Sequence, residues 1–143
     1  MHKHKDKIKN ILSSDEYKEK RNKRSKERYK NDERYKLEIL LRCQFRQALA
    51  LQSEAKRNSV IELLGCSVNQ LVDYISLKFK EGMSWDNHGE WHIDHIRPCA
   101  SFDLSIIKEQ KICFHYTNLQ PLWKEDNLKK SSIYDGIYHR NLK

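Results

Sequence analysis

Apolar residues are distributed very unevenly along this chain. Before Tyr35 the only aliphatic cluster is Ile8, Ile11 and Leu12, and the rest of that segment is polar or charged. A helix built from such residues has almost no face to bury, so it should form only as a solvent-exposed extension or along a partner. From Tyr35 onward apolar residues recur at helical spacing, at Leu37, Leu41, Phe45, Ala48 and Leu49. The folded body is therefore expected to begin near Tyr35.

The excess positive charge lies in the same segment that lacks a core. The 143 residues carry a net charge of +8. Residues 1–42 hold 15 Lys and Arg against 8 Asp and Glu, which leaves 13 against 12 in the rest of the chain. A basic segment beside a near-neutral body is typical of a polyanion-binding arm, although a solvated, highly charged helix has the same composition. We expect a basic helical arm over residues 1–34, with nucleic-acid contacts from the basic residues at its centre, Arg21, Lys23, Arg24, Lys26 and Arg28.

Length and composition favour a single folded domain after this arm. No apolar run approaches the roughly 18 residues that span a bilayer, and the lysine-rich start lacks the apolar stretch of a signal peptide. We therefore expect an intracellular, soluble protein. The cysteines are widely separated and form no C-x-x-C pair, so they are expected to be buried free thiols: Cys43, Cys66, Cys99 and Cys113.

Helix signals continue to residue 82 and define a helical support region over residues 35–82. Ser59-x-x-Glu62 and Ser67-x-x-Gln70 each have the form of a capping box, in which side chains at both ends of the first turn bond to the backbone. The second box should open a helix that ends before Gly82. Its core-facing residues are expected to be Leu71, Tyr74, Ile75 and Phe79.

Residues 83–143 change to a strand, a long loop, a second strand and a helix. Residues 91–96 and 119–123 are the strand candidates, and Pro121 restricts the second strand to an edge or an irregular pairing. The loop between them should contain a short helix, with Phe102, Ile106, Ile107 and Ile112 as packing residues. A helix with acidic residues in its first turn should follow over residues 125–130. The fold class predicted by this order is α+β.

Groups suited to phosphodiester hydrolysis gather in this last region. Such a reaction requires a base that activates water and a cation that offsets charge on the phosphate. His95 is the candidate base because an imidazole has an unperturbed pKa near neutrality. Asp94 is a hard oxygen ligand suited to Mg²⁺, and Asn127 can offer a second oxygen. Lys130 lies about one helical turn after Asn127, where it could meet a phosphate oxygen.

Regular strand alternation would send Asp94 and His95 to opposite faces of the sheet. The base role therefore requires a twist or bulge where the strand ends near Pro98. Arg97 could clamp a phosphate or form an exposed ion pair. Two other histidines are expected outside the chemistry: His92 faces away from His95, and His88 lies solvated in a turn. His115 could line the site or bond to backbone, and the second is favoured. Cys99 and Cys113 could be close in the fold, but two cysteines alone do not make a metal site.

The residues Asp94-His95, Asn118 and Asn127, in this order and spacing, resemble the motif of the HNH nucleases in its His-Asn-Asn variant. Residues 59–132 are similar to small HNH endonucleases of bacteriophages and large DNA viruses. The resemblance implies a ββα-metal (His-Me finger) core over residues 83–143. It makes His95 the general base, Asp94 and Asn127 the ligands of Mg²⁺ or Mn²⁺, and Asn118 the residue that holds the loop and orients the His. Trp123 stands where many members carry a zinc-binding Cys, so no structural zinc is expected.

The sequence therefore predicts a metal-dependent HNH endonuclease that hydrolyses DNA as a monomer or homodimer, without a membrane partner, in the cytoplasm of an infected host cell. Two alternatives stay open. One is a nucleic-acid-binding protein that keeps the fold without catalysis. The other is an HNH nuclease acting on RNA, because a mechanism that activates water makes little use of the ribose 2′-OH.

Overall fold

The computed structural model describes residues 5, 8, 10–11, 13–52 and 59–140, which combine helices with small antiparallel sheets in an α+β arrangement. The chain divides into two compact units, Met1–Lys36 and Leu37–Lys143. Among the described residues, no helix is long and apolar enough to cross a membrane. Ile8, one of the few aliphatic residues of the first unit, is exposed.

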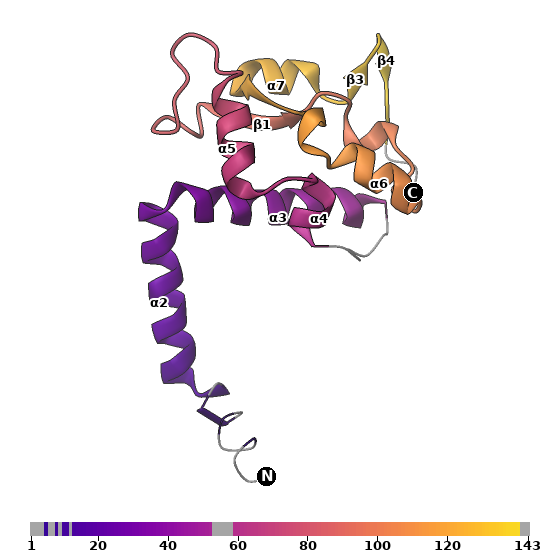
Figure 1. Cartoon of the computed structure of the whole chain (residues 1–143). Coiled ribbons are helices and arrows are strands. Elements are labelled where there is room, and N and C mark those ends of the chain that lie inside the picture. The colour runs from indigo at the N-terminus through magenta and orange to yellow at the C-terminus, as the bar shows by residue number, and fades with distance from the viewer. Residues whose placement is uncertain (1–4, 6–7, 9, 12, 53–58, 141–143) are drawn as a thin grey trace. The chain divides into compact units, whose positions relative to one another are not determined.

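The first unit is built on helix α2 (Asp15–Asn31), which has no buried residue (Figure 1). Its start is capped by the Ser14 hydroxyl, which accepts a hydrogen bond from the Tyr17 amide. A second helix, α3 (Glu33–Leu51), begins two residues after α2 ends, where the Asp32 carboxylate accepts from the Tyr35 amide at 2.9 Å. The Tyr35 hydroxyl lies 2.9 Å from the hydroxyl of Ser25, so the end of α2 is held beside the start of α3. A basic helix is therefore present over Asp15–Asn31, and part of the arm predicted over residues 1–34 lies outside the described residues.

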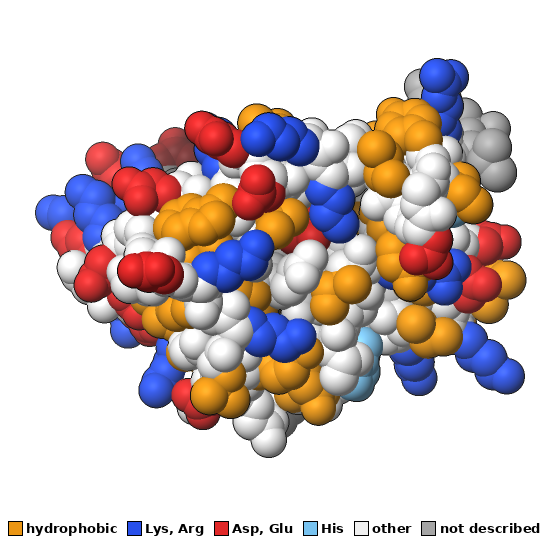
Figure 2. Space-filling model, turned by 90° about the horizontal axis from the view of Figure 1, so that it is seen from above, with side chains coloured by type: hydrophobic (Ala, Val, Ile, Leu, Met, Phe, Trp, Pro, Cys, Tyr) orange, Lys and Arg blue, Asp and Glu red, His pale blue; other side chains and the backbone are white. Residues whose placement is uncertain are grey.

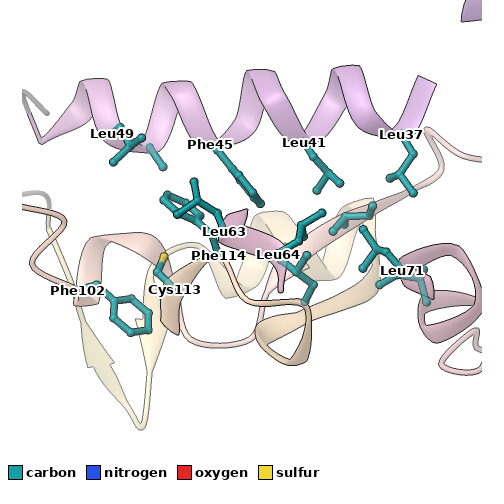
Figure 3. Close-up of a cluster of buried hydrophobic side chains, with 14 of the residues drawn as sticks. Leu37, Leu41, Phe45, Leu49, Leu63, Leu64, Leu71, Phe102, Cys113 and Phe114 are labelled. Carbon is teal, nitrogen blue, oxygen red and sulfur yellow. The ribbon is translucent and has the colours of Figure 1, made fainter. Parts of the chain in front are cut away.

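The core of the second unit is organised along α3. Its buried residues are the predicted ones, Leu37, Leu41, Phe45, Ala48 and Leu49. Figure 3 shows Leu41 and Phe45 pointing from the helix toward Leu63, Leu64 and Phe114. Phe45 stacks on Phe114 with ring centroids 4.3 Å apart. The apolar stripe of α3 thus packs against the short segment that carries Leu63 and Leu64 and against the segment that carries Phe114.

Both predicted capping boxes are confirmed. Ser59 caps α4 (Val60–Leu64) with Glu62, and Ser67 caps α5 (Val68–Ser76) with Gln70. Helix α5 is shorter than predicted, because the amides of Lys78 and Phe79 bond to carbonyls three residues back and tighten the chain into turns. These turns bring the half-buried Phe79 against Trp85 and Trp91.

The sheet that carries the candidate site has two strands. Strand β1 (Trp91–His95) pairs antiparallel with β2 (Leu119–Trp123), from Trp91 opposite Trp123 to His95 opposite Leu119. The segment between them contains 3₁₀-helix η1 (Cys99–Ser101), helix α6 (Ile107–Cys113) and 3₁₀-helix η2 (Tyr116–Asn118). Helix α7 (Lys124–Lys130) follows β2 directly. The predicted order of strand, loop, strand and helix is confirmed, and Pro121 lies in a strand with a free edge.

One packing prediction for the loop is wrong. Phe102 is buried as expected, but Ile106, Ile107 and Ile112 are exposed. Helix α6 turns the side that carries Gln110 and Cys113 toward the core, which leaves the three isoleucines facing solvent. After α7 the chain forms a hairpin of β3 (Ile133–Tyr134) and β4 (Ile137–Tyr138).

Candidate functional site

Strand β1 lies between α7 on one side and the core-facing part of α3 on the other (Figure 1). Side chains alternate along a strand, so Ile93 and His95 face the α3 side while His92 and Asp94 face the α7 side. The contacts agree with this division: the His95 ring lies near Phe45 of α3, whereas Asp94 contacts Lys130 of α7. The site residues are therefore distributed over two faces of one strand.

Asp94 is the centre of a charged network on the α7 face. Its side chain is almost completely buried, and the Lys130 ammonium lies 2.8 Å from Oδ2 and 3.1 Å from Oδ1. The same ammonium donates to the His95 carbonyl oxygen at 2.6 Å. Gln120, opposite Asp94 on β2, donates from Nε2 to Oδ2 at 3.0 Å. Three oxygens from two adjacent residues thus hold one cation, and Lys130 contacts the proposed metal ligand rather than pointing to solvent.

Asn127 lies on the same face, one turn before Lys130 on α7. Its Nδ2 is 3.4 Å from Nδ1 of His92. Both residues line a cavity of about 360 Å³, together with residues of α3 that include Gln44 and Gln47. His92 faces away from His95, as predicted. However, it faces the proposed site beside Asn127, whereas it was expected outside the chemistry. Its position two residues before Asp94 on a strand was the sequence signal for a shared face.

His95 faces the interior. Its side chain is 6% exposed, and its ring lies 6.0 Å from that of Phe45 and 5.8 Å from that of Phe114. β1 pairs with β2 without a bulge through His95, whereas the twist or bulge that the base role needs was expected beyond it, near Pro98. Among the described residues, none forms a hydrogen bond with Nε2 of His95. A buried polar atom without a partner costs about 1–3 kcal/mol, so this nitrogen requires an explanation.

Asn118 connects the two ends of the loop between the strands. Its Nδ2 donates to the carbonyls of Arg97 at 3.0 Å and Cys113 at 2.9 Å, and its Oδ1 accepts from the Arg97 amide at 2.9 Å. Its own carbonyl accepts from the Ile96 amide. The end of β1 is therefore fastened to the end of α6 just beyond His95.

Two cysteines lie beside His95. The sulfurs of Cys99 and Cys113 are 3.4 Å apart, and a ring nitrogen of His95 lies within 4.8 Å of both. The hydrogen bond from the Cys113 thiol holds the pKa of Cys99 well below that of an ordinary thiol, and the same contact raises the pKa of Cys113. The expectation that all four cysteines are buried is wrong, because Cys43 is exposed and Cys66 and Cys99 are partly exposed. Sequence spacing gave no indication of their environments.

The remaining candidates of the body are held by local contacts. The Arg97 guanidinium bonds to the hydroxyl and carbonyl of Ser101 and lies over the Phe102 ring at 3.9 Å, and it forms no ion pair with any described residue. His115 bonds through Nδ1 to the hydroxyl of Thr117 at 2.8 Å. The ring of His88 contacts that of Trp91 at 4.7 Å, so it packs rather than being merely solvated.

The basic residues of α2 present a different surface. Arg28 pairs with Asp32 at 3.1 Å and lies over the Tyr35 ring. For Arg21, Lys23, Arg24 and Lys26 no ion pair is formed with any residue that the structure describes, and all four are exposed. On the face of the molecule seen in Figure 2, Lys and Arg side chains lie interspersed with acidic and hydrophobic side chains. Uncompensated positive charge is thus available on this helix.

The chain is similar to two uncharacterized proteins of Acanthamoeba polyphaga mimivirus. It is 39% identical to the first over 119 residues, which are 81% of this chain and 51% of that protein. It is 37% identical to the second over 117 residues, which are 80% of this chain and 51% of that protein. The chain therefore spans about half the length of the curated relatives it matches. No family model matches the chain, and no solved structure matches it.

Proposed function

We propose that this protein is a metal-dependent HNH endonuclease that hydrolyses phosphodiester bonds in DNA. The observation that carries the proposal is the ion pair in which the Asp94 carboxylate holds the Lys130 ammonium. A buried carboxylate and a main-chain oxygen, placed between a strand pair and the helix that follows it, enclose the Lys130 ammonium. A buried ion pair brings little net stability, because removing both charges from water costs about as much as their attraction returns. A role of Asp94 in binding a cation accounts for the presence of this ion pair.

The donors fit a hard divalent ion. Asp94 and the Asn127 side-chain amide supply oxygen ligands, the type that Mg²⁺ and Mn²⁺ prefer, and two protein ligands leave positions for water and phosphate. Gln120 orients the Asp94 carboxylate from the opposite strand. When bound, such an ion offsets charge on the phosphate and on the leaving oxygen. Release of Lys130 from Asp94 would free its ammonium for a phosphate oxygen.

In this proposal the general base is His95, at the position of the base in the HNH motif that the chain resembles. A neutral imidazole takes the proton of the attacking water. His95 faces Phe45 and Phe114, so its ring has to turn toward the Asp94 side when substrate binds. As the last residue of β1 it can do so at the smallest cost in strand pairing. Asn118 fixes the backbone just beyond it and so acts as a positioning residue.

The base assignment is tested by comparing two histidines of the same strand. His95→Ala should abolish cleavage of supercoiled plasmid in Mg²⁺ while DNA binding, measured by mobility shift in EDTA, persists. His92→Ala, on the other face of β1, should retain cleavage. The opposite pattern would transfer the base role to His92, which lies beside Asn127. Thermal melts of both variants establish that each remains folded.

The same assay separates the two alternative functions. Wild-type protein that binds DNA but cleaves neither DNA nor RNA with any divalent ion would be a binding protein with the HNH arrangement. Cleavage of RNA with DNA left intact would identify an RNA nuclease. The basic side chains of α2 that pair with no described residue are of the kind that contact phosphates, and DNA is proposed as the nucleic acid because of the resemblance to HNH endonucleases.

A further inference from the structure

We infer that His95, Cys99 and Cys113 form a binding site for a thiophilic divalent ion of the zinc class, distinct from the proposed Mg²⁺ site at Asp94. The three residues come from three elements: the end of β1, the start of η1 and the end of α6. One nitrogen and two sulfurs lie within 4.8 Å of one another. The expectation of no structural zinc was based on cysteine pairs close in sequence, whereas this trio is brought together by the fold.

The distances fit tetrahedral coordination after small side-chain movements. Bonds of about 2.3 Å to sulfur and about 2.0 Å to nitrogen separate the ligand atoms of a tetrahedral zinc ion by roughly 3.5–3.8 Å. The two sulfurs are already 3.4 Å apart. Two cysteines and one histidine leave a fourth position for water, an arrangement that zinc proteins use.

Burial and charge favour the same ion. Cys113 is fully buried and His95 nearly so, and Nε2 of His95 has no hydrogen-bond partner among the described residues. Two thiolates and one neutral imidazole balance the charge of Zn²⁺, so the occupied site would be neutral in the interior. The two thiol protons leave to solvent on binding. Mg²⁺, which prefers oxygen ligands, is not expected to compete.

The site has a consequence that rests on the proposed function. A zinc-bound imidazole is held on the inner face of β1 and cannot turn toward Asp94 to act as a base. Zinc would therefore inhibit cleavage that depends on Mg²⁺.

The binding site is tested without reference to catalysis. Full-length protein, with its thiols shown to be reduced, is titrated anaerobically with Co²⁺ and then with Zn²⁺. We expect the visible absorption of tetrahedral cobalt and a thiolate-to-cobalt charge-transfer band, both saturating at one ion per chain and both lost when Zn²⁺ is added. Absence of these bands from folded wild-type protein would overturn the proposal.

Substitutions locate the ion. Cys99→Ser should abolish the thiolate band or weaken it strongly, and Cys99 is partly exposed, so this change disturbs packing less than one at Cys113. The matched control combines Cys43→Ser with Cys66→Ser, the two cysteines outside the trio, and should leave the spectrum unchanged. Bands that persist in Cys99→Ser, or that disappear in the control, would refute the assignment.

A final experiment separates inhibition of cleavage by zinc from binding of the metal ion. Zinc added with excess Mg²⁺ should stop cleavage by wild-type protein but not by Cys99→Ser. Cobalt binding without zinc inhibition would refute the inhibitory role and retain the site. Wild-type protein that binds cobalt but never cleaves nucleic acid would contradict the proposed function, and the metal site would stand.

Discussion

Asn118 shows how a single amide positions the candidate site. Its side chain makes three hydrogen bonds, which join Arg97, two residues after His95, to Cys113 at the end of α6. Asn127 has the same side chain but a different environment, because its Nδ2 lies 3.4 Å from Nδ1 of His92. The two asparagines should therefore respond differently to the same substitution.

Asn118→Ala should lower the free energy of unfolding by about 1–3 kcal/mol, because it leaves partly buried backbone groups without partners. It should also reduce cleavage, since the backbone beyond His95 is no longer fixed. Asn127→Ala, the matched variant, should destabilise the fold less than Asn118→Ala, because Asn127 is only partly buried and its amide contact to His92 is long, yet it should lose cleavage at limiting Mg²⁺. Urea unfolding and plasmid cleavage measure the two effects. Equal destabilisation by both variants would mean that Asn127 is structural.

The residues of the candidate site could be proposed from the sequence more easily than their orientations. Asp94, Asn118 and Asn127 are recognisable by order and spacing, and alternation along a strand places Asp94 and His95 on opposite faces. The sequence could not show that His95 lies against Phe45, Cys99 and Cys113, because those contacts depend on packing between distant segments. Nor could it show that Lys130 binds Asp94, since helix α7 is placed against β1 only by the fold.

At the scale of elements, local signals predicted positions well and packing faces less well. The capping boxes at Ser59 and Ser67 identified two helix starts because caps are short-range interactions. The two strands lie within one residue of their predicted limits. The exposed Ile106, Ile107 and Ile112 were misassigned because α6 is only seven residues long, and its buried side carries Gln110 instead. A helix this short has too few residues for its hydrophobic pattern to define a face.

Helix α2 allows the proposed DNA contacts to be tested by salt dependence. Each phosphate contact contributes about 0.9 to the slope of log K against log salt concentration. Replacing Arg21 and Arg24 with Gln should reduce that slope by roughly 2 and weaken binding to all DNA sequences alike. The matched control is Lys108→Gln with Lys111→Gln, which removes the same charge from exposed positions of α6. Similar slope changes in both double variants would show that α2 has no special role.

At the scale of the whole molecule, the buried cluster lies entirely in the second unit, and that unit holds every residue of the proposed catalytic site. The chain matches about half of each mimivirus relative, so the activity of those longer proteins is a separate question. One site per chain should cut one strand at a time, with double-strand breaks requiring two chains or two events. Nicked circles are therefore expected to accumulate before linear plasmid.

The central claim is tested most directly by incubating supercoiled plasmid with wild-type protein in Mg²⁺ or in EDTA, next to Asp94→Asn. This variant keeps the shape of the side chain but removes the charge that holds a cation. We predict nicked circles in Mg²⁺ with wild-type protein, and intact plasmid both in EDTA and with Asp94→Asn. Cleavage that persists in EDTA, or that is undiminished in folded Asp94→Asn, would contradict a metal-dependent nuclease centred on Asp94.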